Sequence, residues 1–330
     1  MIFKRRILVF LVAITAIICS CINDPSNKVW EPEGKFITQS NIPPLYKLLC
    51  DKKGRYYGLT NDYVISFDKS ILDANAAPDT LPDSYGARDI RFDRNQDLIV
   101  FQGSSIRRYR SGPAGIQVDS LDNSLFNGRI FHVFNTDSGI IMMTNWVSQI
   151  ICWDGTSFTN RGHIQSERYY HISGIFSHEN GLEVFVNSDY SLKRILVKDS
   201  SYTVTKFPSD SLHIGMITKK WNVFLGTGII KENNNWNWVL FTISKSDSLR
   251  VLATIPRNAH QLIETDYAIY LYLYDSVYRI TRGSIRHTNL EPGLQGPLFL
   301  DPNGRPAIFY QNTRRVIYID SLSYTDPKWW

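Results

Sequence analysis

The feature that most constrains the fold of this chain is a unit of short apolar runs separated by turns, which returns seven times. In the first unit, apolar residues 48–50 precede the turn Asp51-Lys52-Lys53-Gly54, and two more apolar runs follow at 56–59 and 64–67. One position in each such turn marks the repeat, at steps of 37 to 46 residues. These positions are Gly54, Gln96, Gly139, Gly181, Trp221, Tyr267 and Gly304.

A period near forty residues with several short strands per unit is typical of a β-propeller, because one small twisted sheet must stack on neighbours to bury its faces. The sequence therefore predicts an all-β fold, a seven-bladed β-propeller with four-stranded blades, over residues 41–330. The last unit supplies only three clear apolar runs. Since an unpaired sheet edge is unfavourable, we expect residues 29–38 to close the ring as the outer strand of the last blade.

The N-terminus has the pattern of a secretory signal, with Lys4-Arg5-Arg6 before an apolar core at 7–18. The core ends in Ile18-Cys19-Ser20-Cys21, which resembles the lipobox of bacterial lipoproteins. That resemblance implies removal of residues 1–20, acylation of Cys21 with chains such as palmitate, and a lipidated tether at 21–40. The alternative is an ordinary signal peptide with a chance cysteine. No Asp follows Cys21 directly, which favours an outer-membrane address without deciding the side that the protein faces.

The charge of the chain argues against nucleic-acid binding, and the positions of its cysteines argue against a disulfide. Without the three basic residues of the leader, 33 basic residues face 31 acidic ones, so the chain has no basic footprint for nucleic acid. Cys50 and Cys152 lie in units one and three, too far apart for a disulfide, and are expected to be free thiols. We expect a monomer that contacts membrane only through its lipid.

The triplet of strand, Asp/Asn-rich Gly turn and strand resembles the propeller repeats of two-component-regulator and related bacterial sensor proteins. The resemblance covers residues 48–319 and extends to the pattern only. Those repeats often carry a Trp in the second strand, where this chain has Tyr57, Ile140 and Leu182. Together with the lipobox, the resemblance implies a Bacteroidota-like cell-envelope protein.

Ligands of propellers usually lie on the face where the innermost strands begin. Turns between second and third strands reach this face with amide, carboxylate and aromatic groups that suit a glycan. The candidate ligand-binding residues there are Trp146, Asp189, Tyr274 and Asn312. The alternative is that Asn, Asp and Ser occupy turns for conformational reasons alone.

A second set of candidates directly precedes the innermost strands. It comprises Arg88, Arg129, Arg168, Tyr169, Tyr170, His171, His213 and His260. His171, His213 and His260 lie on consecutive units, so they could meet near the axis and move protons or bind a divalent ion, as in propeller lyases of acidic polysaccharides. The alternative is that each histidine is simply hydrogen-bonded at a strand start.

Complete catalytic signatures are missing: the sequence has no phosphate loop, no Cys-x-x-Cys, no His-Glu-x-x-His and no Gly-x-Ser-x-Gly. Trp236 and Trp238 could be sugar platforms or could pack between blades. The sequence therefore predicts a lipid-anchored binding or assembly module for a glycan or protein partner, without a cofactor. The alternative is a polysaccharide lyase or glycoside hydrolase at the channel mouth, the only case in which a divalent metal is expected.

Overall fold

The computed structural model describes residues 42–67, 77–112, 115–122, 124–126, 128–144, 149–164, 171–179, 181–188, 191–198, 201–206, 212–232, 235–245, 247–291, 296–310 and 315–325. All of them belong to one compact unit, Phe36–Trp330. The predicted leader, the lipidation site Cys21 and the closing strand at 29–38 lie outside the described residues. No helix in the described ranges is both long and apolar enough to cross a membrane.

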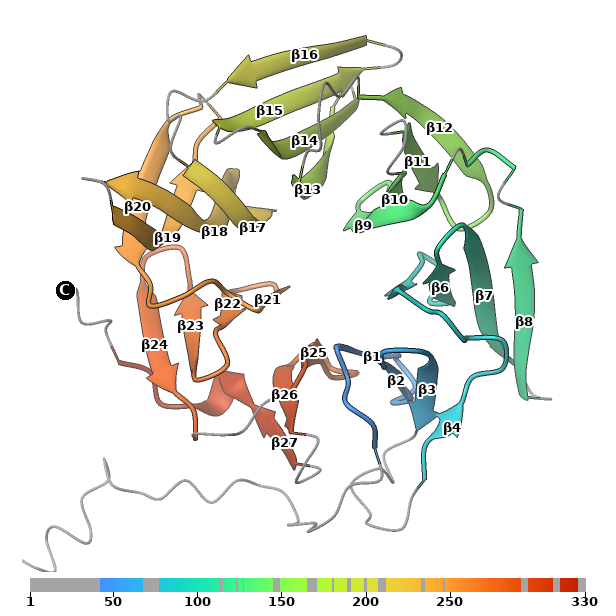
Figure 1. Cartoon of the computed structure of the whole chain (residues 1–330). Helices are drawn as coiled ribbons and strands as arrows, with labels where there is room; N and C mark the ends of the chain where they lie inside the picture. Colours follow the sequence, from blue (N-terminus) through green and yellow to red (C-terminus); the bar gives the residue numbers. More distant parts are fainter. Residues whose placement is uncertain are drawn as a thin grey trace, which may run out of the picture. The chain divides into compact units, whose positions relative to one another are not determined.

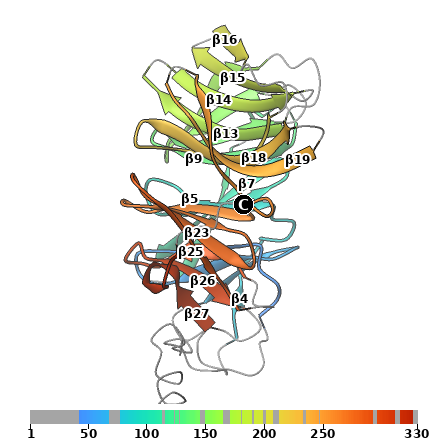
Figure 2. The ribbon, with the colours of Figure 1, turned by 90° about the vertical axis from the view of Figure 1, so that its left-hand side faces the viewer.

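Seven antiparallel sheets follow one another in chain order around an axis, as the repeat predicts (Figure 1). In the side view, β13 to β16 run outward on one side of the ring and β25 to β27 on the other (Figure 2). Six sheets have four strands, and the described part of the seventh has three. The prediction of a seven-bladed propeller is therefore confirmed.

The strands of the first four blades pair as simple meanders from the axis outward. Blade one is β1 (Lys47–Cys50), β2 (Tyr56–Leu59), β3 (Val64–Phe67) and β4 (Asp79–Thr80). Blade two is β5 (Asp89–Phe92), β6 (Leu98–Gln102), β7 (Ser105–Gly112) and β8 (Gly115–Leu121). Blade three is β9 (Ile130–Thr136), β10 (Gly139–Thr144), β11 (Gln149–Trp153) and β12 (Phe158–His163). Blade four is β13 (His171–His178), β14 (Gly181–Ser188), β15 (Ser191–Lys198) and β16 (Ser201–Lys206).

The remaining blades repeat the same meander. Blade five is β17 (Leu212–Lys220), β18 (Val223–Glu232), β19 (Asn235–Ile243) and β20 (Leu249–Thr254). Blade six is β21 (Gln261–Glu264), β22 (Ile269–Tyr272), β23 (Ser276–Ile280) and β24 (Ile285–Asn289). Blade seven is β25 (Leu298–Leu300), β26 (Pro306–Tyr310) and β27 (Arg315–Tyr318), followed by the short 3-10 helix η3 (Ile319–Ser321).

The hydrophobic core is divided among seven clusters, each between two neighbouring blades. One of them joins the last blade to the first, where Phe299 and Phe309 pack with Tyr56 and Phe67. Each sheet therefore buries both faces against its neighbours, which is the physical reason for the repeat. Cys152 is buried in the cluster between blades three and four and Cys50 is half-buried, and neither forms a disulfide, as predicted.

The turns that mark the repeat have a common backbone geometry. Gly54, Gln96, Gly139, Gly181, Trp221 and Gly304 all have left-handed φ angles, between 52° and 151°. In three turns the first residue is a buried Asp, at 51, 93 and 301, whose Oδ1 accepts backbone N–H groups two and four residues later. Tyr267 does not share this φ, and its turn is closed by the bond from Thr265 N to Ala268 O.

Candidate functional site: the cavity on the propeller axis

A cavity of about 740 Å³ lies along the axis, and residues of the innermost strand of every blade line it. Its size is within the range of small-molecule sites. We call the face at which the innermost strands begin the start face, and the face of the Gly turns the turn face. Tyr46 and Phe131 line the cavity near the start face, where their side chains are 53% and 67% exposed.

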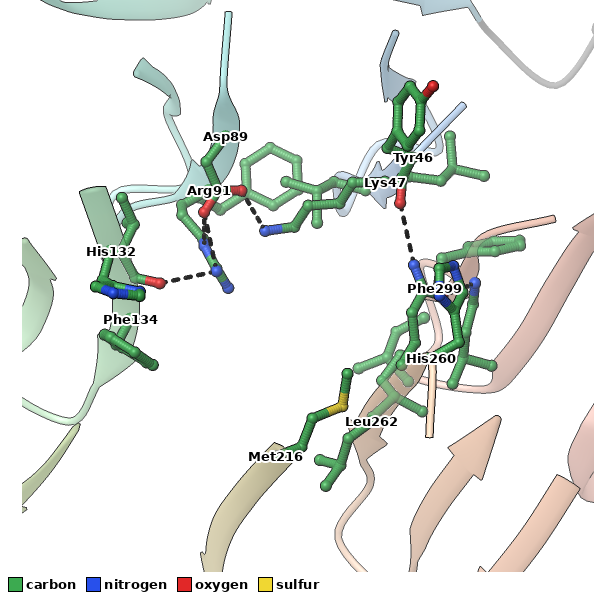
Figure 3. Close-up of a pocket in the computed structure, with 18 of the residues that line it drawn as sticks. Tyr46, Lys47, Asp89, Arg91, His132, Phe134, Met216, His260, Leu262 and Phe299 are labelled. Atoms are coloured by element: carbon green, nitrogen blue, oxygen red, sulfur yellow. Dashed lines mark hydrogen bonds and ion pairs between the residues drawn. The ribbon is translucent and has the colours of Figure 1, made fainter. Parts of the chain in front are cut away.

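A charged cluster from blades one and two forms one side of the cavity (Figure 3). Lys47 Nζ lies 2.7 Å from Asp89 Oδ1, and Arg91 Nη2 lies 3.0 Å from Asp89 Oδ2. Arg91 Nη2 also donates to the carbonyl oxygen of Val133 on blade three, at 2.9 Å. Three neighbouring blades are thus joined by polar contacts at the axis.

The charges of this cluster perturb one another. Burial, reinforced by the positive charge of Arg91, lowers the pKa of Lys47 to about 8, although Asp89 opposes this shift. Burial alone would raise the pKa of Asp89, but Lys47 and Arg91 outweigh it and hold the carboxyl below its usual range. At neutral pH the cluster therefore holds two positive charges and one negative charge.

Two histidines line the cavity as neutral imidazoles. Burial, with a smaller contribution from the charge of His171, lowers the pKa of His132 to about 4, and its Nε2 is buried without a partner among the described residues. Burial also lowers the pKa of His260, whose ring stacks on Tyr274 with 4.1 Å between centroids. A neutral ring carries one nitrogen that accepts hydrogen bonds, so His260 can accept from a ligand hydroxyl, whereas the buried Nε2 of His132 is closed to a ligand.

Three consecutive blades carry a β-bulge at the same height of the innermost strand. The register shifts leave one extra residue in β9, β13 and β17, namely Phe131, Ser173 and Gly215. These residues are 42 positions apart, and all three line the cavity. Bulges turn side chains away from regular alternation and are frequent beside functional sites.

Side chains of blade four hold the bulge of blade five in place. Asn187 Nδ2 donates to Ile214 O at 2.7 Å, and Asn187 Oδ1 accepts from Ile214 N at 2.9 Å. Ser173 Oγ donates to the same carbonyl at 3.1 Å. Both side chains are buried, so this part of the cavity wall is rigidly connected across the blade interface.

The three histidines that the sequence places on consecutive blades have different surroundings. His260 lines the cavity, whereas the ring of His171 contacts His132 and that of His213 contacts Trp236, each at 5.9 Å between centroids. Among the described residues, no three His, Cys, Asp or Glu side chains gather as a metal site. Among the described lining residues of the cavity, the histidines are His132 and His260, not His171 or His213.

The other predicted residues fall into two groups. Arg88 and Arg129 are exposed at the start face and are not among the described residues that line the cavity, whereas Tyr274 adjoins it through His260. Six predicted residues lie outside the described ranges: Arg168, Tyr169, Tyr170, Trp146, Asp189 and Asn312.

The cavity's charged residues Lys47, Asp89 and Arg91 are absent from both predicted sets. One signal could have found them: Lys47 directly precedes the first apolar run of unit one, and Arg91 interrupts that of unit two, although an innermost strand does not need charges for packing. Asp89 and Arg91 are also two residues apart and so lie on the same side of β5. His132 has no comparable signal, because its place in the cavity wall depends on the closed ring.

Comparison with known proteins adds information on the fold. No family model and no curated protein matches the chain. Solved structures do match: virginiamycin B lyase from Staphylococcus aureus has a TM-score of 0.58 at 13% identity, covering 86% of this chain and 97% of that one. The extracellular domain of the one-component system BT4673 from B. thetaiotaomicron has a TM-score of 0.57 at 15% identity. PorZ, a surface component of the type-IX secretion system of Porphyromonas gingivalis, has a TM-score of 0.58 at 10% identity.

These similarities show a shared β-propeller fold. The match covers 90% of this chain but 43% of the BT4673 structure, and 89% of this chain but 39% of PorZ. This chain therefore spans less than half the length of those two structures.

Proposed function

We propose that this protein is a glycan-binding module of the cell envelope, with its ligand on the start face over the axial cavity. The observation that carries the proposal is the gathering of exposed apolar side chains on that face. Among the described residues, Tyr46, Tyr85, Leu125, Phe131 and Trp236 are large, exposed and placed at strand starts or turns of the start face. The described part of the turn face has Tyr267 alone.

Exposed aromatic rings around a mostly apolar cavity that carries a few charged and polar groups match the surface of a sugar. The apolar face of a pyranose ring stacks on an aromatic side chain, and its hydroxyl groups need hydrogen-bond partners. Tyr46 and Phe131 provide rings at the mouth of the cavity, and His260 provides an acceptor within it. This combination supports a saccharide more than a purely apolar ligand.

The two tryptophans of β19 have different environments. Trp238 packs against the cluster between blades five and six. Trp236 is 47% exposed near the tip of the β18–β19 hairpin, where the ring of His213 lies 5.9 Å from its centroid and Lys231 Nζ lies 5.9 Å from it. Trp236 is therefore available as a second sugar platform on the start face.

We further propose that acylated Cys21 anchors the folded unit to the outer membrane. The lipobox supports this, and two proteins of the same fold are described as an extracellular domain and a surface component. In a bacterial host fed a palmitate analogue, the wild-type chain is expected to incorporate label and to fractionate with membranes. Cys21→Ser is expected to lose both properties, and a labelled Cys21→Ser chain would contradict the assignment.

A glycan array with the mature chain tests the binding proposal. We expect binding to at least one class of oligosaccharide, and a loss of about tenfold in affinity for Phe131→Ala, because one stacked ring is lost. Tyr267→Ala, on the turn face, is the matched control and is expected to bind normally. Capture of a stoichiometric envelope protein, with no glycan bound, would overturn the proposal in favour of a protein partner.

A second candidate is a polysaccharide lyase or hydrolase at the same mouth, favoured by the neutral imidazoles of His132 and His260. A neutral imidazole can act as a general base and remove the proton beside a sugar carboxylate. Turnover of a bound glycan that is abolished by His260→Ala, with binding retained, would establish this candidate. Binding without turnover leaves the protein as a binding module.

A further inference from the structure

We propose that the charged side of the axial cavity is a subsite for an anionic substituent, a carboxylate or sulfate group, so that the glycan bound there is acidic. This inference rests on the proposed function and specifies the class of its ligand. It uses Lys47, Asp89 and Arg91, which belong to neither set of residues predicted from the sequence.

The first argument is charge balance. Lys47 and Arg91 bring two positive charges to the cavity, and Asp89 is the single carboxylate among the described residues that line it. His132 adds no charge to the cavity, because burial keeps its ring neutral near pH 7. A positive charge held in a partly desolvated cavity without a counterion is costly, and an anionic ligand group removes that cost.

The second argument is that the hydrogen-bonding groups of this cluster that remain unused are donors and not acceptors. Asp89 Oδ1 accepts from Lys47 Nζ and Ile90 N, and Oδ2 accepts from Nε and Nη2 of Arg91. The carboxylate is therefore saturated. Arg91 Nη1 and two of the three Lys47 ammonium hydrogens have no partner among the described residues. The unused groups are all donors, and only an acceptor can satisfy them.

The third argument is access. The side chains of Lys47 and Arg91 are 22% and 26% exposed, and both line the cavity, so a ligand can reach the donors. Lys47 and Arg91 extend toward each other from neighbouring blades, with Met216 and Leu262 on the opposite side (Figure 3). A sugar with one charged substituent has this same division into a charged end and an apolar ring face.

Binding of three matched trisaccharides to the mature chain tests the inference: trigalacturonate, its neutral methyl ester, and a sulfated trigalactoside. We expect at least one anionic probe to bind about tenfold more tightly than the ester, as a charge-assisted hydrogen bond would provide. The uronate and sulfate arms distinguish the two sources of charge. Equal binding of all three probes would overturn the anionic subsite and leave the glycan-binding proposal standing, whereas no binding would overturn both.

Arg91→Gln is the test variant and Arg88→Gln its matched control, since Arg88 carries the same charge on the same segment but is exposed outside the described cavity lining. We expect Arg91→Gln to lose the preference for the anionic probe and to keep its binding of the ester. A preference that survives in Arg91→Gln would overturn the assignment. Lys47→Met, with folding checked by circular dichroism, provides a second variant that leaves the Asp89–Arg91 pair intact.

Discussion

At the residue scale, Lys47 is a charged cavity residue whose pKa lies close to physiological pH. Its pKa is lowered to about 8, and it faces Asp89 and Arg91 of β5, with the neutral His132 farther along the wall. As the pH rises from 7 to 9, Lys47 loses its proton and the net charge of the cluster falls from +1 to zero. We predict that the affinity for an anionic glycan falls over this window, by about tenfold.

Titration of binding between pH 6 and pH 9.5 measures this effect, and Lys47→Met is expected to show a flat profile. The lowered pKa of Lys47 has the opposite effect on stability, which increases as the pH rises. Because the unfolded chain binds the Lys47 proton up to pH 10.5 and the folded chain only up to about pH 8, this group favours folding progressively as the pH rises between those values. Affinity that is constant across pH 8 in the wild type would rule out a role for the Lys47 charge.

Glu183 is a second residue whose charge has a clear consequence. It is 1% exposed between blades four and five and accepts from Arg194 and from Lys219 Nζ. Glu183→Gln would leave both cations without this carboxylate, so we predict a loss of about 2–3 kcal/mol in the free energy of unfolding. Urea denaturation measures the loss.

The control for that prediction is Asp320→Asn, which breaks the more exposed pair between Arg305 and Asp320. Its effect is expected to stay below about 1 kcal/mol, because water and salt screen an exposed pair. If the two variants lose equal stability, Glu183 is not the structural anchor that its burial indicates.

At the scale of elements, the glycines of the marker turns fall into two physical classes. Gly139 has a φ of 130°, and a Cβ added there would lie 2.1 Å from the carbonyl oxygen of Trp153. Gly304 has a φ of 75°, with open space around the same position. We predict that Gly304→Ala costs about 1 kcal/mol from backbone strain, whereas Gly139→Ala costs about 3 kcal/mol or more because β11 must move.

Thermal and urea unfolding of the two alanine variants, side by side, checks this difference. A smaller loss for Gly139→Ala than for Gly304→Ala would mean that the β10–β11 contact is looser than the structure shows.

The strands themselves could be predicted from the sequence, because alternation and turn residues are local signals that repeat seven times. The bulges at Phe131, Ser173 and Gly215 could not, since a bulge is a register difference between two strands and leaves no separate mark in either one. The residues that line the cavity could be predicted from the sequence only in part, for the same reason. Arg88 is the more conspicuous residue in the sequence, yet β5 begins one residue later and turns Asp89 and Arg91 toward the axis.

Histidine placement illustrates the same limit. His171, His213 and His260 have similar positions in consecutive repeats, but the contacts of each ring depend on neighbouring blades. His132 meets the cavity because blade three carries its bulge at Phe131, directly before it. Repeat position thus predicts the height of a residue along the axis more reliably than the direction of its side chain.

At the scale of the whole molecule, blade seven differs from the other blades, because it has three strands in the described ranges and they have four. Thr325, the last described residue, bridges to His287 on β24, so this end of the described chain is fastened to blade six. We predict that residues 29–38 supply the missing outer strand, and that deleting them lowers the midpoint of thermal unfolding by about 5 °C or more.

Deletion of 22–28, the polar part of the tether, is the matched control and should leave the midpoint unchanged. An unaltered midpoint in the 29–38 deletion would show that the ring closes without this segment.

The central claim is that the axial cavity at the start face holds the ligand. A crystal structure of the mature chain with a saturating acidic trisaccharide tests it most directly. The account predicts a sugar ring near Phe131 and an anionic group within hydrogen-bond distance of Lys47 and Arg91. A saccharide seated on the turn face or on the outer strands, or an axial cavity that holds only water, would contradict it.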